Sequence, residues 1–428
     1  MKLSGTTNND CKVLIFDEEN FELEHIGNLT NGVFSISYLK SGTKSVITDD
    51  ADGRTSGYGN VEVVDDTANE YQELSFVHGS LYTCGYNTYG QLGHNDRIAR
   101  STLTKVGNEV NWTNVSCASS HFIGIQSNGT IWGCGANTSG QLGLNNRINM
   151  STPTRIGTSN MWRDVFTKVS FSLFLHDDYS LWGCGINSNG QLGLNNRLNR
   201  STPTLIGTDT DWRKVSCGNF HVVGIKQDGT MWSWGAGDNG RLGLGDIAPR
   251  STPTRIGSDN DWKSIKCSTH GNFATKEDGS LWVWGQNSWY DLGLGDTVSR
   301  STPTKVGNRT DWISYDIGLF VGGDGELWAY GDFSENGHLG FPSTGTVSTP
   351  TRVIGAKVGW KRIIAGSSYL SIGLRQNNTL WSFGQNTRGE LGHGDLIARS
   401  TPTQIGSFSN WYTASAGYQH FAAIRTES

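Results

Sequence analysis

Cysteine is the first residue type in this sequence that could carry chemistry. The chain of 428 residues has seven cysteines, and none belongs to a Cys-x-x-Cys pair of the kind that zinc and redox sites use. Six of them fall at two repeated positions: Cys84, Cys134 and Cys184 at the first, and Cys117, Cys217 and Cys267 at the second. The other repeats have aromatic rings at the first position: Trp234, Trp284, Tyr330 and Phe383. A position that accepts sulfur and aromatic rings is an apolar packing position, so we predict buried free thiols.

A run of carboxylates is the second candidate. Asp49-Asp50-Ala51-Asp52-Gly53 resembles part of a calcium loop, but aligning its glycine with the loop glycine leaves Thr48 at position one and Gly59 where a bidentate Glu is needed. We interpret the run as a solvated turn. The sequence has no His-Glu-x-x-His, no Gly-x-Ser-x-Gly and no phosphate-binding loop. We therefore predict no catalytic residue, no cofactor and no metal, and a protein that is not an enzyme.

Arginines at one repeated position could form a cationic ring for an anionic partner. They stand just before a Ser-Thr-x-Thr segment: Arg100, Arg200, Arg250, Arg300 and Arg399. Asp246, Asp296 and Asp395 each precede one of them by four residues, so we predict local ion pairs or turn bonds instead. Met150 and Val347 also interrupt the ring.

One irregular turn is the candidate binding site. Other repeats have Ser139-Gly140 or Asn189-Gly190 in this turn, whereas the fifth has Trp289-Tyr290. Glycine in such a turn serves a special backbone conformation, so a tyrosine there weakens the turn with no evident packing return. Because exposed aromatic side chains are common binding anchors, we predict that Trp289 and Tyr290 contact a partner. The alternative is that the pair covers a neighbouring repeat or the N-terminal domain.

The elements that position these residues follow from two repeated patterns. A tryptophan ladder has steps of 50, 50, 50, 50, 48 and 51 residues: Trp112, Trp162, Trp212, Trp262, Trp312, Trp360 and Trp411. A second ladder has seven segments that end in glycine, such as Ile131-Trp132-Gly133-Cys134-Gly135. Within one unit, four β-rich stretches alternate with Gly, Asn and Asp turns. Four strands repeated at this period predict an all-β fold containing a seven-bladed β-propeller.

The ends of the chain favour a closed propeller over an open solenoid. Trp411 to Arg425 supplies the first half of a repeat, whereas the segment from about Phe76, which includes Leu81–Gly85, supplies only a second half. We therefore predict one blade shared between the two ends, joining the segment near Leu81 to the segment near Phe421. Complementary halves close a ring and protect its edges, and an open solenoid gains nothing from them.

The first 64 residues do not follow the period and contain no tryptophan. Their apolar residues alternate between polar turns, as at Val13 and Ile15, which is typical of a small β-sandwich. We predict three parts: a small β-sandwich attachment domain over 1–64, a linker over 65–70, and the seven-bladed propeller over 71–428.

The sevenfold pattern resembles the regulator of chromosome condensation repeat family over about residues 71–428. The resemblance rests on Gly-Gln-Leu-Gly turns at 90–93, 140–143 and 190–193, on Pro-Thr segments such as Pro153-Thr154, and on Trp-x-x-Gly strands. It implies a seven-bladed propeller whose roles in the family diverge: nucleotide exchange on the small GTPase Ran with nucleosome binding, ultraviolet-B sensing, β-lactamase inhibition and scaffolding. Family members commonly carry a histidine where His121, His221 and His420 stand, and because Phe171 replaces it in one repeat, we interpret this position as packing.

The segment before the repeats resembles a transthyretin-like or carboxypeptidase-regulatory-like module. The polar turn Thr30-Asn31-Gly32 precedes an alternating strand, and Ser41–Val46 followed by Tyr58–Val61 looks like modules of tailed-phage virion proteins. This resemblance implies attachment to a phage particle through other virion proteins.

Composition and charge limit the function. The net charge of −5, with no run of Lys or Arg, argues against a nucleic-acid partner. No apolar run matches a signal peptide or a membrane helix, so we expect synthesis in the host cytoplasm and no membrane insertion. We predict a non-enzymatic virion protein of a tailed bacteriophage. Its small domain anchors it to the particle, its propeller is displayed to a host-surface protein or glycan, and a homo-oligomer in the particle is one option.

Two other functions stay open. The alternative is a cytoplasmic regulator, such as a guanine nucleotide exchange factor-like effector that acts on a small GTPase. A secreted enzyme inhibitor is disfavoured by the missing signal peptide.

Overall fold

The computed structural model describes residues 2–6, 11–17, 23–28, 33–37, 42–50, 55–63, 72–73, 78–316, 318–332, 337–340, 345–353, 359–366 and 369–426. Strands make up nearly all of the regular structure in these residues, and the single helical turn among them is η1 (Asp238–Gly240). The predicted all-β class is therefore confirmed. No helix in this part of the chain has the length and apolar character needed to cross a bilayer.

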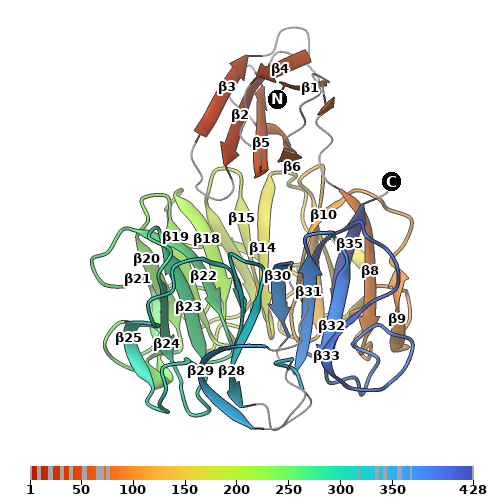
Figure 1. Cartoon of the computed structure of the whole chain (residues 1–428). Helices are drawn as coiled ribbons and strands as arrows, with labels where there is room; N and C mark the ends of the chain where they lie inside the picture. Colours follow the sequence, from red (N-terminus) through yellow and green to blue (C-terminus); the bar gives the residue numbers. More distant parts are fainter. Residues whose placement is uncertain are drawn as a thin grey trace.

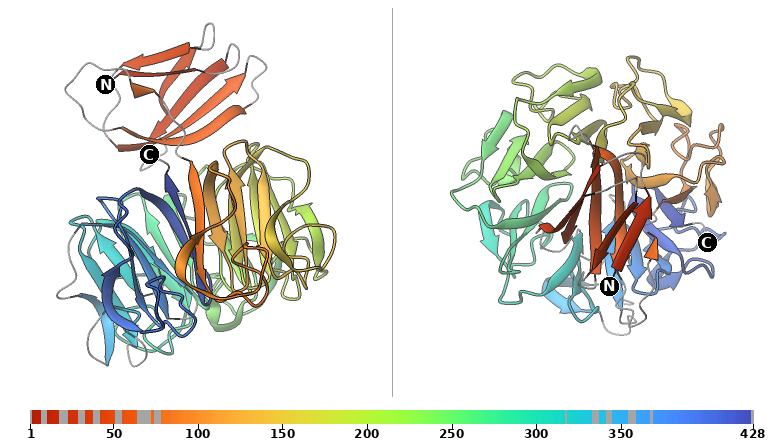
Figure 2. Two further views of the ribbon diagram at one scale, coloured as in Figure 1. Left: turned by 90° about the vertical axis from the view of Figure 1, so that its right-hand side faces the viewer. Right: turned by 90° about the horizontal axis from the view of Figure 1, so that it is seen from above.

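Five successive repeats each form a separate four-stranded antiparallel sheet in which chain order is spatial order. Figures 1 and 2 show these sheets as the blades of a propeller. The blades are β14 (Trp162–Lys168), β15 (Phe171–His176), β16 (Leu181–Gly185) and β17 (Arg200–Leu205); β18 (Trp212–Cys217), β19 (His221–Lys226), β20 (Met231–Gly235) and β21 (Arg250–Arg255); β22 (Trp262–Cys267), β23 (Gly271–Lys276), β24 (Leu281–Gly285) and β25 (Arg300–Lys305); β26 (Trp312–Asp316), β27 (Leu319–Gly322), β28 (Leu327–Asp332) and β29 (Thr346–Arg352); and β30 (Trp360–Ala365), β31 (Leu370–Arg375), β32 (Leu380–Gly384) and β33 (Arg399–Gln404).

The remaining repeats lie in one eight-stranded sheet. Its strands are β8 (Gly79–Gly85), β9 (Arg100–Lys105), β10 (Trp112–Cys117), β11 (His121–Gln126), β12 (Ile131–Gly135), β13 (Met150–Arg155), β34 (Trp411–Ala416) and β35 (His420–Thr426). A seven-bladed propeller was predicted, and this number is wrong: five blades are separate four-stranded sheets. The physical reason is that Trp112 at the start of β10 pairs with Gly79 at the start of β8, which joins two repeats into one ladder.

The two ends of the repeat region pair as predicted. Strand β35 runs antiparallel to β8, with Ile424 opposite Leu81 and Phe421 opposite Cys84. Strand β34 completes this half of the sheet on one side and β9 on the other. Residues more than 300 positions apart in sequence thus share a blade, and the ring is closed by hydrogen bonds between strands.

The tryptophan ladder marks the inner strands β10, β14, β18, β22, β26, β30 and β34, which contact one another from blade to blade. Trp112 packs across Gly124 of the next strand, where an added Cβ would lie 2.6 Å from the indole ring, and Trp212 packs in the same way across Gly224. The small residue is therefore needed for this close approach. Most of the ladder indoles are buried between neighbouring sheets, and the core is a ring of clusters between blades.

Side chains close the free edges of several inner strands. The Ser216 hydroxyl accepts the Cys267 N–H at 2.8 Å, and the Asp316 carboxylate accepts the Ala365 N–H at 3.1 Å. The hydroxyl of Ser415 likewise accepts the N–H of Cys117 at 2.9 Å. An unpaired strand edge would otherwise leave these N–H donors without a partner, so at these three places one blade supplies the acceptor for the next.

The N-terminal segment has two further sheets, and only its strands are described. One has the order β4 (Val33–Ser37), β1 (Lys2–Thr6), β7 (Gln72–Glu73), and the other β3 (Leu23–Asn28), β2 (Cys11–Asp17), β5 (Gly42–Asp50), β6 (Thr55–Val63). Asp49 and Asp50 lie at the end of β5, whereas Asp52, Gly53 and the predicted linker 65–70 lie outside the described residues. Within the described part of the chain, no cluster of His, Cys, Asp and Glu could hold a metal ion.

Candidate binding site

The propeller has two chemically different ends. The Trp end is the one at which the inner strands begin with their ladder tryptophans and at which β8 starts, and the label C marks it in Figure 1. The turn end is opposite, where strands such as β12 finish and the Gly-Gln-Leu-Gly turns follow. Trp289 and Tyr290 follow β24 and therefore lie at the turn end.

An ordinary turn shows what the repeat requires. Asn137 accepts the Leu142 N–H at 2.9 Å, and Gln141 accepts the Ser139 N–H at 2.9 Å. Gly140 has φ +84°, and a Cβ there would lie 2.6 Å from the Cα of Ser201 in the next blade. The glycine is needed both for its left-handed backbone and for this approach between blades.

The irregular turn keeps this frame without the glycine. Asn287 accepts the Leu292 N–H at 2.9 Å, and Gly295 still donates to the Ser348 carbonyl of the next blade at 2.9 Å. Tyr290 takes the glycine position with φ +60°. A non-glycine residue in this region costs on the order of 1 kcal/mol, so the turn is strained and the frame around it holds it in place.

The two aromatic side chains are not equally exposed. Trp289 is 63% exposed, whereas Tyr290 is half-buried. The exposure expected of a binding residue is therefore large at Trp289 and smaller at Tyr290, and their contact with a partner stays a prediction. Polar groups of two blades lie beside the turn, since Asn239 donates to Gln286 at 3.4 Å and Gln286 donates to Ser288 at 3.3 Å.

Further aromatic residues at this end were missed in the sequence. Tyr89, Tyr369 and Tyr418 are between 38% and 47% exposed. Tyr89 stands in the turn after β8, and the other two stand in the turns that lead into β31 and β35. Comparing the short turns before the second strand of each repeat would have revealed two of them.

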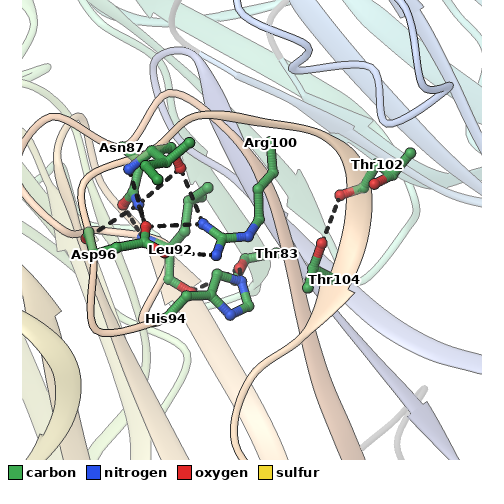
Figure 3. A network of polar contacts seen from close by, with 9 residues as sticks. Thr83, Asn87, Leu92, His94, Asp96, Arg100, Thr102 and Thr104 are labelled. Carbon is green, nitrogen blue, oxygen red and sulfur yellow. Dashed lines mark hydrogen bonds and ion pairs between the residues drawn. The ribbon is translucent and has the colours of Figure 1, made fainter.

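Four of the five repeated arginines form local ion pairs, and Arg200 instead donates to the Leu198 carbonyl at 3.1 Å and to Asn196 Oδ1 at 3.4 Å, so the predicted ion pairs or turn bonds are confirmed. Arg100 Nη2 lies 2.8 Å from Asp96 Oδ2 (Figure 3), and the corresponding distances are 2.7 Å for Arg250–Asp246, 2.7 Å for Arg300–Asp296 and 2.8 Å for Arg399–Asp395. The hydrogen bond from Arg100 holds the pKa of Asp96 well below its usual range. Asn87 donates to the same carboxylate at 3.0 Å, so these arginines fix the loop before the outer strand.

The repeated histidines join neighbouring blades. The ring nitrogen Nε2 of His121 lies 3.0 Å from the Ser172 hydroxyl, and that of His221 lies 2.8 Å from Asn272 Oδ1. Both rings are fully buried, and burial lowers the pKa of each to about 3. They are therefore neutral packing residues, as predicted.

The six cysteines of the repeats are free and buried. Burial raises the pKa of Cys117 and of Cys267 to about 12. Cys184 Sγ lies 3.4 Å from the Gln141 carbonyl of the preceding turn, and Trp234, at the same repeated position as Cys184, donates to the equivalent Gln191 carbonyl at 3.0 Å. The predicted packing role of these thiols is confirmed.

Comparison with protein families agrees with this geometry. The sequence model of the RCC1-like domain matches residues 52–323, more than half of the chain. This chain belongs to the RCC1-like domain family. The regulator of chromosome condensation (RCC1) repeat also matches residues 377–424, which include β32, β33, β34 and most of β35.

Solved structures show the same fold at low sequence identity. Human WBSCR16 is 20% identical with a TM-score of 0.72, and the alignment covers 82% of this chain and 99% of that chain. Prp20p of Saccharomyces cerevisiae, in a structure described with its binding to Gsp1p and histones, is 18% identical with a TM-score of 0.74, covering 83% and 93%. Yeast RCC1 (Prp20) bound by Kap60 is 17% identical with a TM-score of 0.73, covering 86% and 97%. At these identities the likeness concerns the fold alone.

Proposed function

We propose that this RCC1-like chain is a non-enzymatic interaction protein of a tailed bacteriophage virion. In this proposal, segment 1–64 is a small β-sandwich that attaches to other virion proteins, and the propeller is displayed to bind a protein or glycan of the host surface. The single observation that carries the binding role is Trp289, a 63% exposed indole next to a strained Tyr290. Such a side chain reduces solubility, and burial against a partner is worth roughly 1.5–3 kcal/mol.

The arrangement of the two ends supports this division of roles. The chain enters the propeller at Gly79, at the Trp end, whereas Trp289 lies at the turn end. A protein anchored through its N-terminal segment would thus present the turn end away from the point of attachment. The resemblance of Ser41–Val46 and Tyr58–Val61 to virion modules supports the particle as the site of attachment.

Two experiments test the proposal. Mass spectrometry of purified particles should detect the chain at a fixed copy number, and its absence from particles would rule out the virion role. Trp289→Ser with Tyr290→Gly copies the Ser139-Gly140 turn, and it should weaken attachment to host cells while thermal unfolding stays cooperative. Phe408→Ser, at a 52% exposed ring of the Trp end, is the matched control and should bind as the unmodified protein does.

A cytoplasmic regulator of a small GTPase is the second candidate. It is supported by the fold shared with Prp20p, whose structure is described with its binding to Gsp1p. A nucleotide-exchange assay with a small GTPase separates the two functions. Acceleration by this chain, together with its absence from particles, would favour the regulator.

A further inference from the structure

Three consecutive loops at the turn end carry the same pair of exposed residues. They read Asn-Asp-Arg-Ile at 95–98, Asn-Asn-Arg-Ile at 145–148 and Asn-Asn-Arg-Leu at 195–198. Each loop leads into the outer strand of its repeat, β9, β13 or β17. We call the six exposed residues of these loops the basic aliphatic edge: Arg97, Ile98, Arg147, Ile148, Arg197 and Leu198.

The backbone of each loop is held in the same way. Asn95, Asn145 and Asn195 adopt left-handed φ values of 62°, 57° and 56°. Their N–H groups donate to the carbonyls of the next outer strand at 2.7–2.8 Å. The N–H of each aliphatic residue donates to the carboxylate or amide two positions earlier, at 2.9 Å for Ile98 and Ile148 and 3.0 Å for Leu198. The edge is therefore a rigid row with one equivalent pair per blade.

The side chains of the edge are exposed. Ile98 is 68% exposed, and Ile148 and Leu198 are each 65% exposed. The three arginines are also exposed, and none of them forms an ion pair with another described residue. Arg100, three residues after Arg97, is by contrast held by Asp96. The loops thus combine free positive charge with aliphatic surface in a chain of net charge −5.

We infer that the basic aliphatic edge binds the surface of an anionic phospholipid bilayer. Arginine forms charge-assisted, often bidentate, hydrogen bonds with phosphate groups. An aliphatic side chain next to it reaches the boundary between headgroups and acyl chains, where burial of apolar area adds to the electrostatic attraction. A nucleic-acid backbone would satisfy the arginines but would leave the isoleucines and the leucine in water.

The other three described loops act as an internal comparison. Two of them carry equally exposed aliphatic residues at the position of Ile98, with Val298 at 62% and Ile397 at 67%, and the third has Ala248 there beside Ile247, which is 68% exposed. At the arginine position, however, they have Ile247, Thr297 and Leu396. The unpaired arginines are confined to three neighbouring blades. We therefore expect the bilayer to contact one side of the turn end and not its whole rim.

This surface is distinct from Trp289, and the inference does not depend on the virion role. The test is co-sedimentation of the full chain with vesicles of phosphatidylcholine alone, or of phosphatidylcholine and phosphatidylglycerol in a three to one ratio. Binding should require phosphatidylglycerol and decrease with salt. Ile98→Ser, Ile148→Ser and Leu198→Ser combined should lower the partition coefficient at least about tenfold, and so should Arg97→Gln, Arg147→Gln and Arg197→Gln combined.

The matched control is Ile247→Ser, Val298→Ser and Ile397→Ser combined, which should bind within about twofold of the unmodified chain. Thermal unfolding of every variant verifies the fold. No binding to the anionic vesicles, or equal binding by the edge and control variants, would overturn the inference. If soluble glycerol phosphate abolishes vesicle binding, the edge is a site for phosphate groups and not for a bilayer. If the chain binds duplex DNA as tightly as anionic vesicles, the edge is a nucleic-acid site.

Discussion

The Trp end and the turn end of the propeller treat their aromatic residues in opposite ways. At the Trp end, a cation lies over two aromatic rings, or over three in the case of Arg425, in each of five blades: Lys226, Lys276, Arg309, Arg375 and Arg425. In one such clamp, Lys276 Nζ lies 4.9 Å from the Trp262 ring centre and 5.0 Å from that of Trp282. Asp259 and Asp261 pair with the same ammonium at 2.7 and 3.0 Å.

At the turn end, by contrast, one tryptophan side chain faces water. Trp289 is 63% exposed, and the loops around it present aliphatic residues of similar exposure, such as Val298. The backbone beneath these residues is nonetheless held by repeated side-chain hydrogen bonds, for example from Asn287 to the Val298 carbonyl at 3.2 Å. The turn end therefore combines a hydrogen-bonded backbone with apolar side chains that are exposed to water.

The difference separates residues that stabilise the protein from residues available to partners. A buried tryptophan that is covered by a cation and its carboxylates, such as Trp262, has little free area for a partner to contact, and its removal lowers the free energy of unfolding. An exposed ring on a fixed turn contributes little to folding and can be buried by a ligand without further ordering. Substitutions at the two ends should therefore change different measurements.

The largest expected effect comes from opening the ring, which is closed by the pairing of β35 with β8. Deleting Trp411–Ser428 removes β34 and β35, and with them the whole ladder on one side of β8. Trp411 and Phe421 also leave the core cluster that contains Cys84 and Leu391. We expect loss of cooperative unfolding or a large fall in melting temperature by calorimetry. If the shortened chain melts as the full chain does, ring closure is not a source of stability.

The sequence predicted the parts of this structure that the repeat itself encodes. The Trp ladder located every inner strand, and Asp four residues before Arg located the loop ion pairs, because both are local and recur at the same spacing. The joining of two repeats through Trp112 and Gly79 was missed because it depends on how two distant edges meet.

The candidate site was predicted only in part, for a similar reason. Trp289 and Tyr290 were recognised by their departure from the repeat, but their exposure depends on the adjacent blade, which the local sequence does not encode. The lysine clamps were also missed. The Asp-x-Asp-Trp pattern at Asp209–Trp212 and Asp259–Trp262, each with a lysine fourteen residues after the tryptophan, was the available signal.

A second prediction concerns pH and the buried histidines at the repeated position of His121. Burial lowers the pKa of His121 and His221 to about 3 and that of His420 to about 4. An unfolded histidine titrates near 6.5, so the unfolded chain binds protons that the folded chain does not. Stability should therefore fall as pH decreases from about 6.5 toward 4, by about 1.4 kcal/mol per pH unit for each ring.

One carboxyl group works in the opposite direction. Burial raises the pKa of Asp164 to about 6, so this group stabilises the fold as pH falls from 6 toward 4 and offsets about one histidine. Melting temperatures between pH 7.5 and 4.5 measure the net effect. His221→Phe, which copies Phe171 at the equivalent buried position, should reduce the slope. An unchanged slope would show that His221 does not set the pH dependence.

The smallest expected effect is the most direct test of the contrast between the ends. Lys276→Gln copies Gln126, which stands at the same repeat position, and it removes the ammonium from two rings and two carboxylates. We expect a loss of about 1–2 kcal/mol in the free energy of unfolding. Trp289→Ser should change it by less than about 0.5 kcal/mol, since the indole is mostly in water.

Denaturant titration of both variants under one condition gives the comparison. The expected order follows from solvent exposure. The Lys276 side chain is 12% exposed, so its ion pairs are little screened by water. The Trp289 ring is mostly exposed, so its removal takes away few packing contacts. If Trp289→Ser instead destabilises the fold as much as Lys276→Gln does, the indole is part of the packing between blades. Trp289 would then be used for packing within the protein, as the tryptophans of the Trp end are, and the binding role assigned to it would be wrong.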